Sequence, residues 1–351
     1  MARLFERGLS FAFMIALVVR AEEPLDLGAR MQPVPRAAVF QDEGWFTWGG
    51  SMVQGDDGRY YLCYSRWPYD VQMKGWITHS QIACAVADHP LGPYRFSHKV
   101  LEGRGDGFFD ATMVHNPHIH KFDGTYYLYY IGATAQPKFE ATRRTQRIGV
   151  ATAPSIHGPW KRLDKPLLDV SPDSFDSQFT TNPSVVEHNG RYVMLYKCLG
   201  KNKKVFHGVA FSDSPTGPFK KHGQPIFTHE THPFPAEDPF IFPYHGKLHA
   251  ILSDHAVFTG IKQALCLFTS ENGIDWEPAV IPLISDRTVT WEDGTQEKLA
   301  DLERPQIYFG ADGEPMVLFC AATHVKRAPG NTFNIHIPLN RGLLLNPEEH
   351  E

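Results

Sequence analysis

Short apolar runs, each closed by turn residues, follow one another along most of this chain. The runs are rich in Tyr, Phe, Val and Ile, as in TYYLYYIGA from Thr125 and RYVMLYKCL from Arg191. The chain has 29 Gly and 27 Pro, and 13% of its residues are aromatic. Apolar runs bounded by Gly, Pro, Asp and Asn are typical of β-strands. The pattern therefore predicts many short strands rather than a helical bundle.

The strands belong to a repeat that covers most of the chain. Four copies align on one proline, at intervals of 66, 56 and 66 residues: Pro117, Pro183, Pro239 and Pro305. An earlier copy has Gly50 at this position. In every copy a glycine follows seven or eight residues later, after Asp, Asn or His: Gly58, Gly124, Gly190, Gly246 and Gly313. We interpret each of these dipeptides as a two-residue hairpin turn.

Each hairpin is followed by a third apolar strand and then by a tight turn that ends in an aromatic residue. The turn recurs, the last time in degenerate form, as Gly92-Pro93-Tyr94, Gly158-Pro159-Trp160, Gly217-Pro218-Phe219 and Ile274-Asp275-Trp276. We expect the aromatic residue to begin or cap an outer fourth strand. Repeats of four strands at this period indicate propeller blades, whereas solenoid units are usually shorter. The sequence predicts an all-β fold, a five-bladed β-propeller with four-stranded antiparallel blades. Residues 37–40 are candidates for the strand that closes the ring.

The innermost strand of each blade lines the channel of a propeller, so the residues at its start converge on one place. There the repeat places polar, charged and aromatic residues: Trp48, Gly49, Gly50, His115, Asn116, Thr181, Asn182, Glu237, Asp238, Glu303 and Arg304. Packing does not readily explain such side chains on otherwise apolar strands. We expect the functional site at this place.

Composition and the N-terminus restrict the setting in which the protein works. The 34 Lys and Arg against 39 Asp and Glu give a net charge of −5, which excludes the basic surface that nucleic-acid binding needs. Residues 1–21 have a basic start and an apolar stretch from Leu9 to Val19, typical of a secretory signal peptide cleaved near Ala21. We expect residues 22–351 to form a single propeller catalytic domain, secreted or periplasmic, without a membrane span.

The five cysteines lie in apolar runs and are interpreted as core residues.

The blade pattern resembles glycoside hydrolase family 43 and its five-bladed relatives, including family 117. The resemblance rests on a proline followed by apolar residues, on Asp-Gly-x-Tyr-Tyr-Leu and on Gly-Pro-Trp, across roughly residues 37–340. It implies three channel carboxylates: an Asp base in blade one, an Asp that tunes a pKa in blade three, and a Glu acid in blade four. Glu237, in Pro-Ala-Glu-Asp-Pro, matches the Glu of blade four. The other two positions are Gly49 and Asn182, so the chain is similar to a divergent member or a sister family.

The same resemblance makes a channel metal possible and points to a second glutamate. It leaves room for a divalent cation in the channel, held by His and water. No ligand spacing in the chain demands a metal, so we assign no metal ligand and expect no cofactor to be required. Glu303, in Leu-Glu-Arg-Pro, resembles a Glu of some family 43 subgroups.

Hydrolysis of a glycosidic bond usually needs two carboxyl groups, one protonated and one ionised. We expect Glu237 to be the general acid, because desolvation and the nearby Asp238 and Glu303 would raise its pKa. Glu303 is a candidate for the base or nucleophile, with Arg304 keeping it ionised. The distance between the carboxyls decides whether the sugar configuration is inverted or retained, and the sequence does not supply it.

Two further carboxylates are candidates for the base or nucleophile. Asp110 and Asp176 each follow a Phe and stand seven residues before the repeated proline. We expect their loops to fold over the same channel mouth, although an Asp at such a place also organises turns. Other side chains near this face are expected to bind substrate: Trp48, His115, Asn116, Asn182, Lys197, Asp238, Asp254 and Arg304. The basic members among them suit sugar hydroxyls, or the carboxylate or sulfate of an acidic sugar.

The sequence thus predicts a glycosidase that releases a terminal sugar from an oligosaccharide or polysaccharide, because a narrow channel suits exo action. Two alternatives stay open. One is a glycoside phosphorylase on the same scaffold, in which Lys197, Arg304 and His115 would hold phosphate. The other is a non-catalytic carbohydrate-binding propeller, which the missing acids at Gly49 and Asn182 favour.

Overall fold

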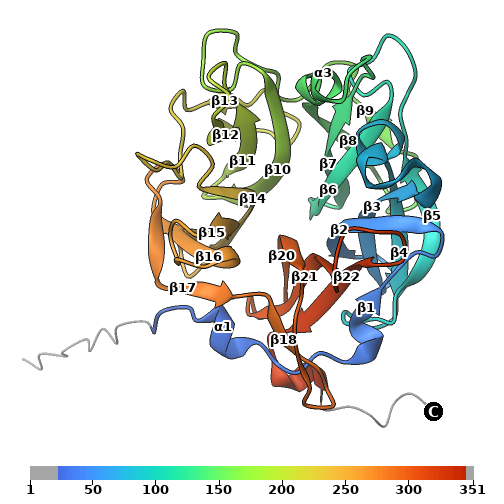
Figure 1. The fold of residues 1–351 in the computed structure, drawn as a ribbon, viewed down its shortest axis with the longest axis vertical. Helices are drawn as coiled ribbons and strands as arrows, with labels where there is room; N and C mark the ends of the chain where they lie inside the picture. Colours follow the sequence, from blue (N-terminus) through green and yellow to red (C-terminus); the bar gives the residue numbers. More distant parts are fainter. Residues whose placement is uncertain (1–22, 345–351) are drawn as a thin grey trace, which may run out of the picture.

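Five four-stranded antiparallel sheets stand in a ring (Figure 1). The computed structural model describes residues 23–344, so the predicted signal peptide lies outside the described residues. Blade one contains β2 (Trp45–Gln54), β3 (Tyr60–Pro68), β4 (Gln81–Ala87) and β5 (Arg95–Leu101). Blade two contains β6 (Met113–Phe122), β7 (Thr125–Ala133), β8 (Arg147–Ala153) and β9 (Lys161–Arg162). Blade three contains β10 (Phe179–His188), β11 (Arg191–Leu199), β12 (Val205–Ser212) and β13 (Lys220–Lys221). Blade four contains β14 (Ala236–Tyr244), β15 (Lys247–His255), β16 (Lys262–Ser270) and β17 (Glu277–Ser285).

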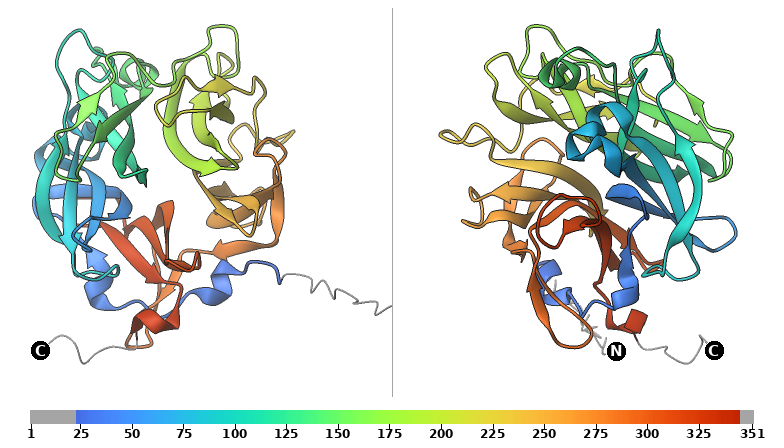
Figure 2. Two further views of the ribbon diagram at one scale, coloured as in Figure 1. Left: turned by 180° about the vertical axis from the view of Figure 1, so that it is seen from behind. Right: turned by 45° about the vertical axis from the view of Figure 1, so that its right-hand side comes forward.

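The fifth blade joins the two ends of the described chain. Three of its strands come from the C-terminal part: β20 (Asp301–Phe309), β21 (Pro315–Thr323) and β22 (Thr332–Pro338). The outer strand is β1 (Val39–Phe40), in which Val39 pairs with Ile335 and Phe40 with Asn334. Figures 1 and 2 show this N-terminal segment passing beside the last blade. The predicted five-bladed propeller is confirmed, and residues 39–40 close the ring as expected.

Short elements decorate the ring. The α-helices are α1 (Leu27–Arg30), α2 (Trp76–His79) and α3 (Phe139–Arg144), and the 3-10 helices are η1 (Arg36–Ala38), η2 (Tyr69–Val71), η3 (Met73–Gly75) and η4 (Arg341–Leu344). A small hairpin, β18 (Thr288–Thr290) and β19 (Gln296–Lys298), stands between blades four and five. None of the helices among the described residues is long and apolar enough to cross a membrane.

The turn prediction is correct in three blades and wrong in two. Asp123-Gly124, Asn189-Gly190 and His245-Gly246 have positive φ at both residues, as a two-residue type I′ turn requires. In blades one and five the loops are longer, because β2 ends at Gln54 and β3 begins at Tyr60, and because β20 ends at Phe309 and β21 begins at Pro315. Each predicted aromatic residue stands immediately before its outer strand, as Tyr94 does before β5.

Every innermost strand contains a bulge at the same point of the repeat. The strand register shifts between the residues that flank it, as between His115 and His118 in blade two. One residue in each bulge has φ between 50° and 57°: Gly49, Asn116, Asn182, Asp238 and Arg304. A bulge bends its strand and changes where the side chains point. The repeat therefore turns one side chain per blade toward the axis, except at Gly49.

The blades pack on apolar cores between neighbouring sheets. All five cysteines are buried in these cores and free, as expected: Cys63, Cys84, Cys198, Cys266 and Cys320. Fully buried aromatic side chains such as Trp67, Tyr129 and Phe268 fill the same spaces. Buried polar side chains at the start of the inner strands include His115, Thr181, Asp238 and Glu303.

Candidate active site

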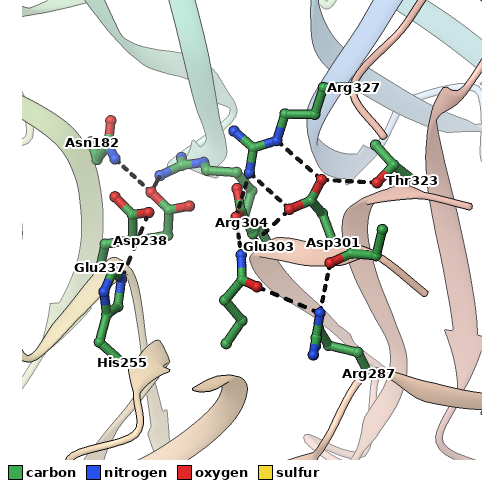
Figure 3. A network of polar contacts seen from close by, with 12 residues as sticks. Asn182, Glu237, Asp238, His255, Arg287, Asp301, Glu303, Arg304, Thr323 and Arg327 are labelled. Atoms are coloured by element: carbon green, nitrogen blue, oxygen red, sulfur yellow. Dashed lines mark hydrogen bonds and ion pairs between the residues drawn. The ribbon is translucent and has the colours of Figure 1, made fainter. Parts of the chain in front are cut away.

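The left-handed residues of the five bulges meet around the channel axis. Nδ2 of Asn116 donates to Oδ1 of Asn182 at 2.9 Å, and Nδ2 of Asn182 donates to Oδ1 of Asp238 at 2.6 Å. Nη1 of Arg304 donates to the same Asp238 oxygen at 3.3 Å (Figure 3). Gly49 completes the ring, because a Cβ added there would lie 3.4 Å from Oδ1 of Asn116 and 3.5 Å from Cγ of Arg304. These contacts form a polar ring across the channel.

A cavity of about 220 Å³ lies at this place and is lined by residues from all five blades. It contains nine of the predicted site residues: Trp48, His115, Asn116, Asn182, Lys197, Glu237, Asp238, Glu303 and Arg304. The inner-strand starts therefore converge as the repeat predicts. The role of each of these nine residues depends on the contacts that its side chain makes.

Glu237 is held by basic groups from neighbouring strands. The Nζ atom of Lys197, on β11, lies 2.7 Å from its Oε2 atom. Nε2 of His255, at the end of β15, lies 3.9 Å from its Oε1 atom. Burial by itself raises the pKa of Glu237, but Lys197, His255 and Arg327 together outweigh it and hold the pKa below its usual range. The Glu237 carboxylate is therefore ionised at neutral pH.

The pKa of Glu303 is shifted in the opposite direction. Its side chain is only 7% exposed, against 23% for Glu237. Burial raises the pKa of Glu303 to about 8, with help from the charges of Glu237, Asp238 and Asp301 and against the opposing effect of Arg327. Arg327 also makes two contacts of 3.1 Å with Asp301, so its charge is shared between two carboxyls (Figure 3). A carboxyl group with this pKa is mostly protonated at neutral pH.

The expected charge states of the two glutamates are therefore reversed. Arg304 contacts Asp238 and not Glu303, so it does not keep Glu303 ionised as predicted. Burial and like charge raise the pKa of Glu303, whereas at Glu237 the combined effect of Lys197, His255 and Arg327 outweighs burial and lowers the pKa. One oxygen of each of Glu237, Asp238 and Glu303 lies within 4.8 Å of the others. The two glutamates are thus close neighbours with unequal pKa values, which is the arrangement that acid/base work on one bond requires.

Aromatic rings form one wall of the cavity. Trp48, Trp67 and Trp76 all line it, and the ring of His115 lies 5.0 Å from that of Trp76. Nδ1 of His115 is 2.8 Å from the hydroxyl of Ser80. Burial, with the charges of Arg304 and Lys197, lowers the pKa of His115 to about 3. His115 is therefore a neutral hydrogen-bonding group beside flat apolar faces, a combination that suits a sugar ring.

No family model matches the chain. A probable arabinan endo-1,5-alpha-L-arabinosidase B from Aspergillus fumigatus is 29% identical over 161 residues. The match covers 43% of this chain and 40% of the fungal protein, so the chain spans about two fifths of the length of that relative. Among solved structures, the family 117 glycoside hydrolase Zg3597 from Zobellia galactanivorans has a TM-score of 0.62 at 18% identity, over 85% of this chain and 86% of that one. A thermostable family-43 glycoside hydrolase has a TM-score of 0.59 at 12% identity, over 85% and 91%.

The chain has the fold of these propeller glycosidases. The expected resemblance to families 43 and 117 is confirmed at this level. Within this glycosidase fold, Gly49 and Asn182 occupy the places where the sequence comparison expected two aspartates. Neither offers a carboxyl group, and the structure instead brings Glu303 from blade five to the cavity.

Three predicted site residues lie elsewhere. Asp110 is fully buried between Arg104, at 2.7 Å, and Arg162, at 3.1 Å, and accepts a hydrogen bond from Tyr130. It does not line the cavity. The prediction that Asp110 lies at the channel mouth is therefore wrong. Its carboxylate instead connects the loop to β7 and β9 of blade two through Tyr130 and Arg162.

Asp176 repeats this arrangement in blade three. It is fully buried, pairs with Lys221 of β13 and accepts a hydrogen bond from Tyr196 of β11. Asp254 accepts hydrogen bonds from the backbone N–H groups of residues 257–259 and from the Thr259 hydroxyl. Neither carboxylate lines the cavity, so the geometry assigns both to loop structure rather than to substrate.

The sequence interpretation missed several cavity residues: Met73, Trp76, Arg143, Gln146, Phe179 and Arg327. Most of them come from connections between the second and third strands of blades one, two and five, which vary between copies. Arg327 lies in such a loop between β21 and β22, and its guanidinium lies 4.7 Å above the ring of Trp48. No repeat position signals the loop residues, because the loops that carry them are the parts of the blades that do not repeat.

A divalent cation does not fit the three neighbouring carboxyl groups of the cavity. Glu237, Asp238 and Glu303 are the one group within residues 23–344 whose oxygens are close enough to share a metal ion. Each of these carboxyls already contacts a cation, namely Lys197, Arg304 and Arg327 in the same order. The three positive charges repel a divalent cation. They also compete with it for the carboxylate oxygens, which are the ligands that Ca²⁺ and Mg²⁺ need. We therefore assign no step to a metal.

Proposed function

We propose that this protein is a secreted, exo-acting glycoside hydrolase that releases a terminal sugar from an oligosaccharide or polysaccharide. The observation that carries the proposal is the unequal pair of glutamates in the cavity, one ionised and one protonated at neutral pH. Cleavage of a glycosidic bond uses one carboxyl of each kind on either side of the bond. The fold shared with propeller glycosidases supports the same conclusion.

In this proposal Glu303 is the general acid. Its burial keeps the proton on the carboxyl near neutral pH, where it can be given to the oxygen of the departing sugar or alcohol. Glu237, ionised beside Lys197, acts on the anomeric carbon side of the bond. Lys197 and Arg327 are positioning residues, because each holds one of the two carboxyls in place.

The size of the cavity supports exo action. The volume of about 220 Å³ is small, and the polar ring of Asn116, Asn182, Asp238 and Arg304 lines the cavity. A chain end can enter such a pocket, whereas the middle of a polysaccharide would need an open groove. The relative from Aspergillus fumigatus bears the name of an arabinan hydrolase, which makes arabinose-containing oligosaccharides the first substrates to test.

The cavity also carries donors without partners. Nε2 of Gln146, Nε1 of Trp67 and Nε of Arg304 are buried without a hydrogen-bond acceptor. Arg143, in the same wall, lies 3.4 Å from Glu140 and has its guanidinium 5.8 Å from the centre of the Phe179 ring. An excess of donors suits an acceptor-rich ligand, and we propose that the substrate carries an acidic group such as a carboxylate beside Arg143.

The test is hydrolysis of defined plant and algal oligosaccharides, both neutral and acidic, by the purified protein. We expect a monosaccharide as the first product, and we expect Glu237→Gln and Glu303→Gln each to lose at least about a hundredfold in kcat/KM. Glu277→Gln is the matched control, because Glu277 is exposed on the outer strand β17. Absence of hydrolysis across the panel, or near-normal turnover by both active-site variants, contradicts the proposal. Longer oligosaccharides as first products contradict exo action alone.

A further inference from the structure

We propose that the protein selects its substrate by one hydroxyl group of the terminal sugar, which binds beside Gly49 between Arg304 and Asn116. This inference rests on the proposed hydrolase function and adds to it the group by which the site chooses its sugar. It is separate from the acidic group that we propose beside Arg143.

The first argument is the direction of the hydrogen bonds in the polar ring. The carboxylate of Asp238 accepts, so the amide nitrogen of Asn182 is the atom that donates to it (Figure 3). Oδ1 of Asn182 then faces the other way and accepts from Nδ2 of Asn116 at 2.9 Å. The amide of Asn116 therefore turns its own oxygen toward Gly49, the one position of the ring that has no side chain.

The second argument is a pair of buried polar atoms that lack partners at this point of the ring. Nη1 of Arg304 donates to Asp238, but Nε of the same guanidinium has no acceptor within the described residues. Oδ1 of Asn116 has no donor within them either. Asn116 is 7% exposed and Arg304 is 3% exposed. Buried donors and acceptors without partners are unfavourable, so this place favours a ligand that supplies both.

The third argument is the space that glycine leaves. A Cβ added to Gly49 would lie 3.4 Å from Oδ1 of Asn116 and 3.6 Å from Nε of Arg304. These are ordinary van der Waals distances, and no closer contact is made there. The side of Gly49 that a side chain would occupy is therefore bordered by both unpartnered atoms. Asn116 and Arg304 also line the cavity that contains Glu237 and Glu303, so a substrate in that cavity meets them.

The chemistry of the two atoms selects a hydroxyl group. The Nε–H group of Arg304 needs an acceptor, and Oδ1 of Asn116 needs a donor. The oxygen of one hydroxyl group can accept from Arg304 while its hydrogen is donated to Asn116. A carboxylate or sulfate would instead bring negative charge against Oδ1 of Asn116. A sugar with a hydroxyl at this place should therefore be preferred over its deoxy analogue, which leaves both atoms unpaired.

Water offers the same chemistry as a sugar hydroxyl, so the experiment must distinguish the two sources. It measures kcat/KM for the oligosaccharide cleaved in the hydrolysis panel and for its analogues in which one hydroxyl of the terminal sugar is replaced by hydrogen. We expect one position to cost at least about a hundredfold, because its loss leaves Arg304 and Asn116 unpaired. Losses below about tenfold at every position would overturn the inference and leave the hydrolase function intact. Absence of any hydrolysis across the panel instead overturns the proposed function.

The variant Gly49→Asn tests whether the critical hydroxyl binds at this place. Asparagine adopts the left-handed conformation, as Asn116 and Asn182 do at the same repeat position. Its amide can accept from Arg304 and donate to Asn116 in place of the sugar. We expect the variant to lose at least about a hundredfold on the full substrate, and removal of the critical hydroxyl to cost it less than about threefold more. A loss on deoxygenation as large as in the wild type would overturn the inference.

A measurement on the protein alone makes the test independent of turnover. Gly49→Asn and Gly49→Ala both place a Cβ at a left-handed position, but only asparagine offers a donor and an acceptor. Gly190, in the exposed turn between β10 and β11, has φ of 74° and nothing among the described residues within 4 Å of an added Cβ. Its Asn and Ala variants therefore measure the backbone effect alone and should keep wild-type kcat/KM.

We expect the urea midpoints of the Asn and Ala variants to differ more at position 49 than at position 190, because asparagine at 49 joins Arg304 to Asn116. Equal differences at the two positions would mean that the space beside Gly49 does not select a group that both donates and accepts. That result would overturn the inference without bearing on hydrolysis.

Discussion

The ammonium group of Lys197 lies 2.7 Å from Oε2 of Glu237, although the two residues belong to different blades and are 40 positions apart. This contact contributes to the charge state of Glu237. It places a positive charge on the carboxylate that the family resemblance marks as the acid, and so lowers the pKa of Glu237. The proton stays on Glu303, which is more deeply buried. The two carboxyls therefore differ in protonation because their neighbours differ.

A first prediction concerns the pH dependence of kcat/KM. The proposed mechanism requires Glu303 protonated and Glu237 ionised, so the profile should be bell-shaped. The upper limb should fall as the pH rises through about 8, where Glu303 loses its proton. The lower limb should fall below the ordinary range of a glutamate, where Glu237 gains one. The measurement is the initial rate at low substrate concentration across a pH series. A plateau that continues well above the pKa of Glu303 would contradict its role as the acid.

A second prediction tests Lys197. Lys197→Met removes both the hydrogen bond and the charge that lower the pKa of Glu237, so the lower limb of the profile should move toward neutral pH. The upper limb, which reports Glu303, should move less. Lys197→Arg keeps the charge and should restore most of the acidic range. A uniform loss of activity at all pH values, with the limbs unmoved, would mean that Lys197 acts on binding or folding instead.

The sequence predicts the ring of the site better than its electrostatics. Asn116, Asn182, Asp238 and Arg304 stand at one repeat position, and their contacts join residues 66, 56 and 66 positions apart, which are the intervals of the repeat. Periodicity is a property of the chain itself, so the convergence of these residues could be deduced. The partners of Glu303 could not, because Arg327 comes from a loop that does not repeat.

The shared offset of Asp110 and Asp176 reflects a real structural similarity, but the prediction that both face the channel mouth is wrong. Their shared offset does mark one device used twice, since each accepts a hydrogen bond from a tyrosine on the second strand and pairs with a cation on the outer strand. A buried carboxylate paired with cations has the same sequence signature as one that faces a cavity. The two kinds of carboxylate are distinguished only by the positions of Arg162 and Lys221 in the folded protein.

A third prediction follows from that correction. Asp110→Asn leaves Arg162 without its carboxylate partner and Arg104 with the exposed Asp164 at 3.2 Å, so the free energy of unfolding should fall by about 3–5 kcal/mol. The kcat/KM of the folded fraction should change by less than about twofold, because Asp110 does not line the cavity. Urea unfolding and rates normalised to folded protein measure the two effects. A large loss of activity in fully folded protein would return Asp110 to the site.

A fourth prediction concerns Arg143, which lines the cavity and whose guanidinium lies 3.4 Å from Glu140. A charge-assisted hydrogen bond to a substrate carboxylate is worth about 1.5–3 kcal/mol. Arg143→Ala should therefore raise KM for an acidic oligosaccharide by about tenfold or more, and leave KM for its methyl ester nearly unchanged. Equal effects on both substrates would mean that Arg143 does not recognise an acidic group.

The last prediction tests how the ring is closed. Phe40 joins the first and last blades, because its backbone pairs with β22 while its ring packs edge-on against Tyr64 of β3 at 4.9 Å. The side chain is 4% exposed, so Phe40→Ala opens a cavity at the seam and should lower the free energy of unfolding by about 3–5 kcal/mol. Val280→Ala, at a residue 84% exposed on β17, should change it by less than about 0.5 kcal/mol. Urea titration of both variants measures the difference. If Phe40→Ala unfolds like wild type, the seam is held by the pairing of the sheet backbones alone, and the N-terminal strand contributes little through its side chains.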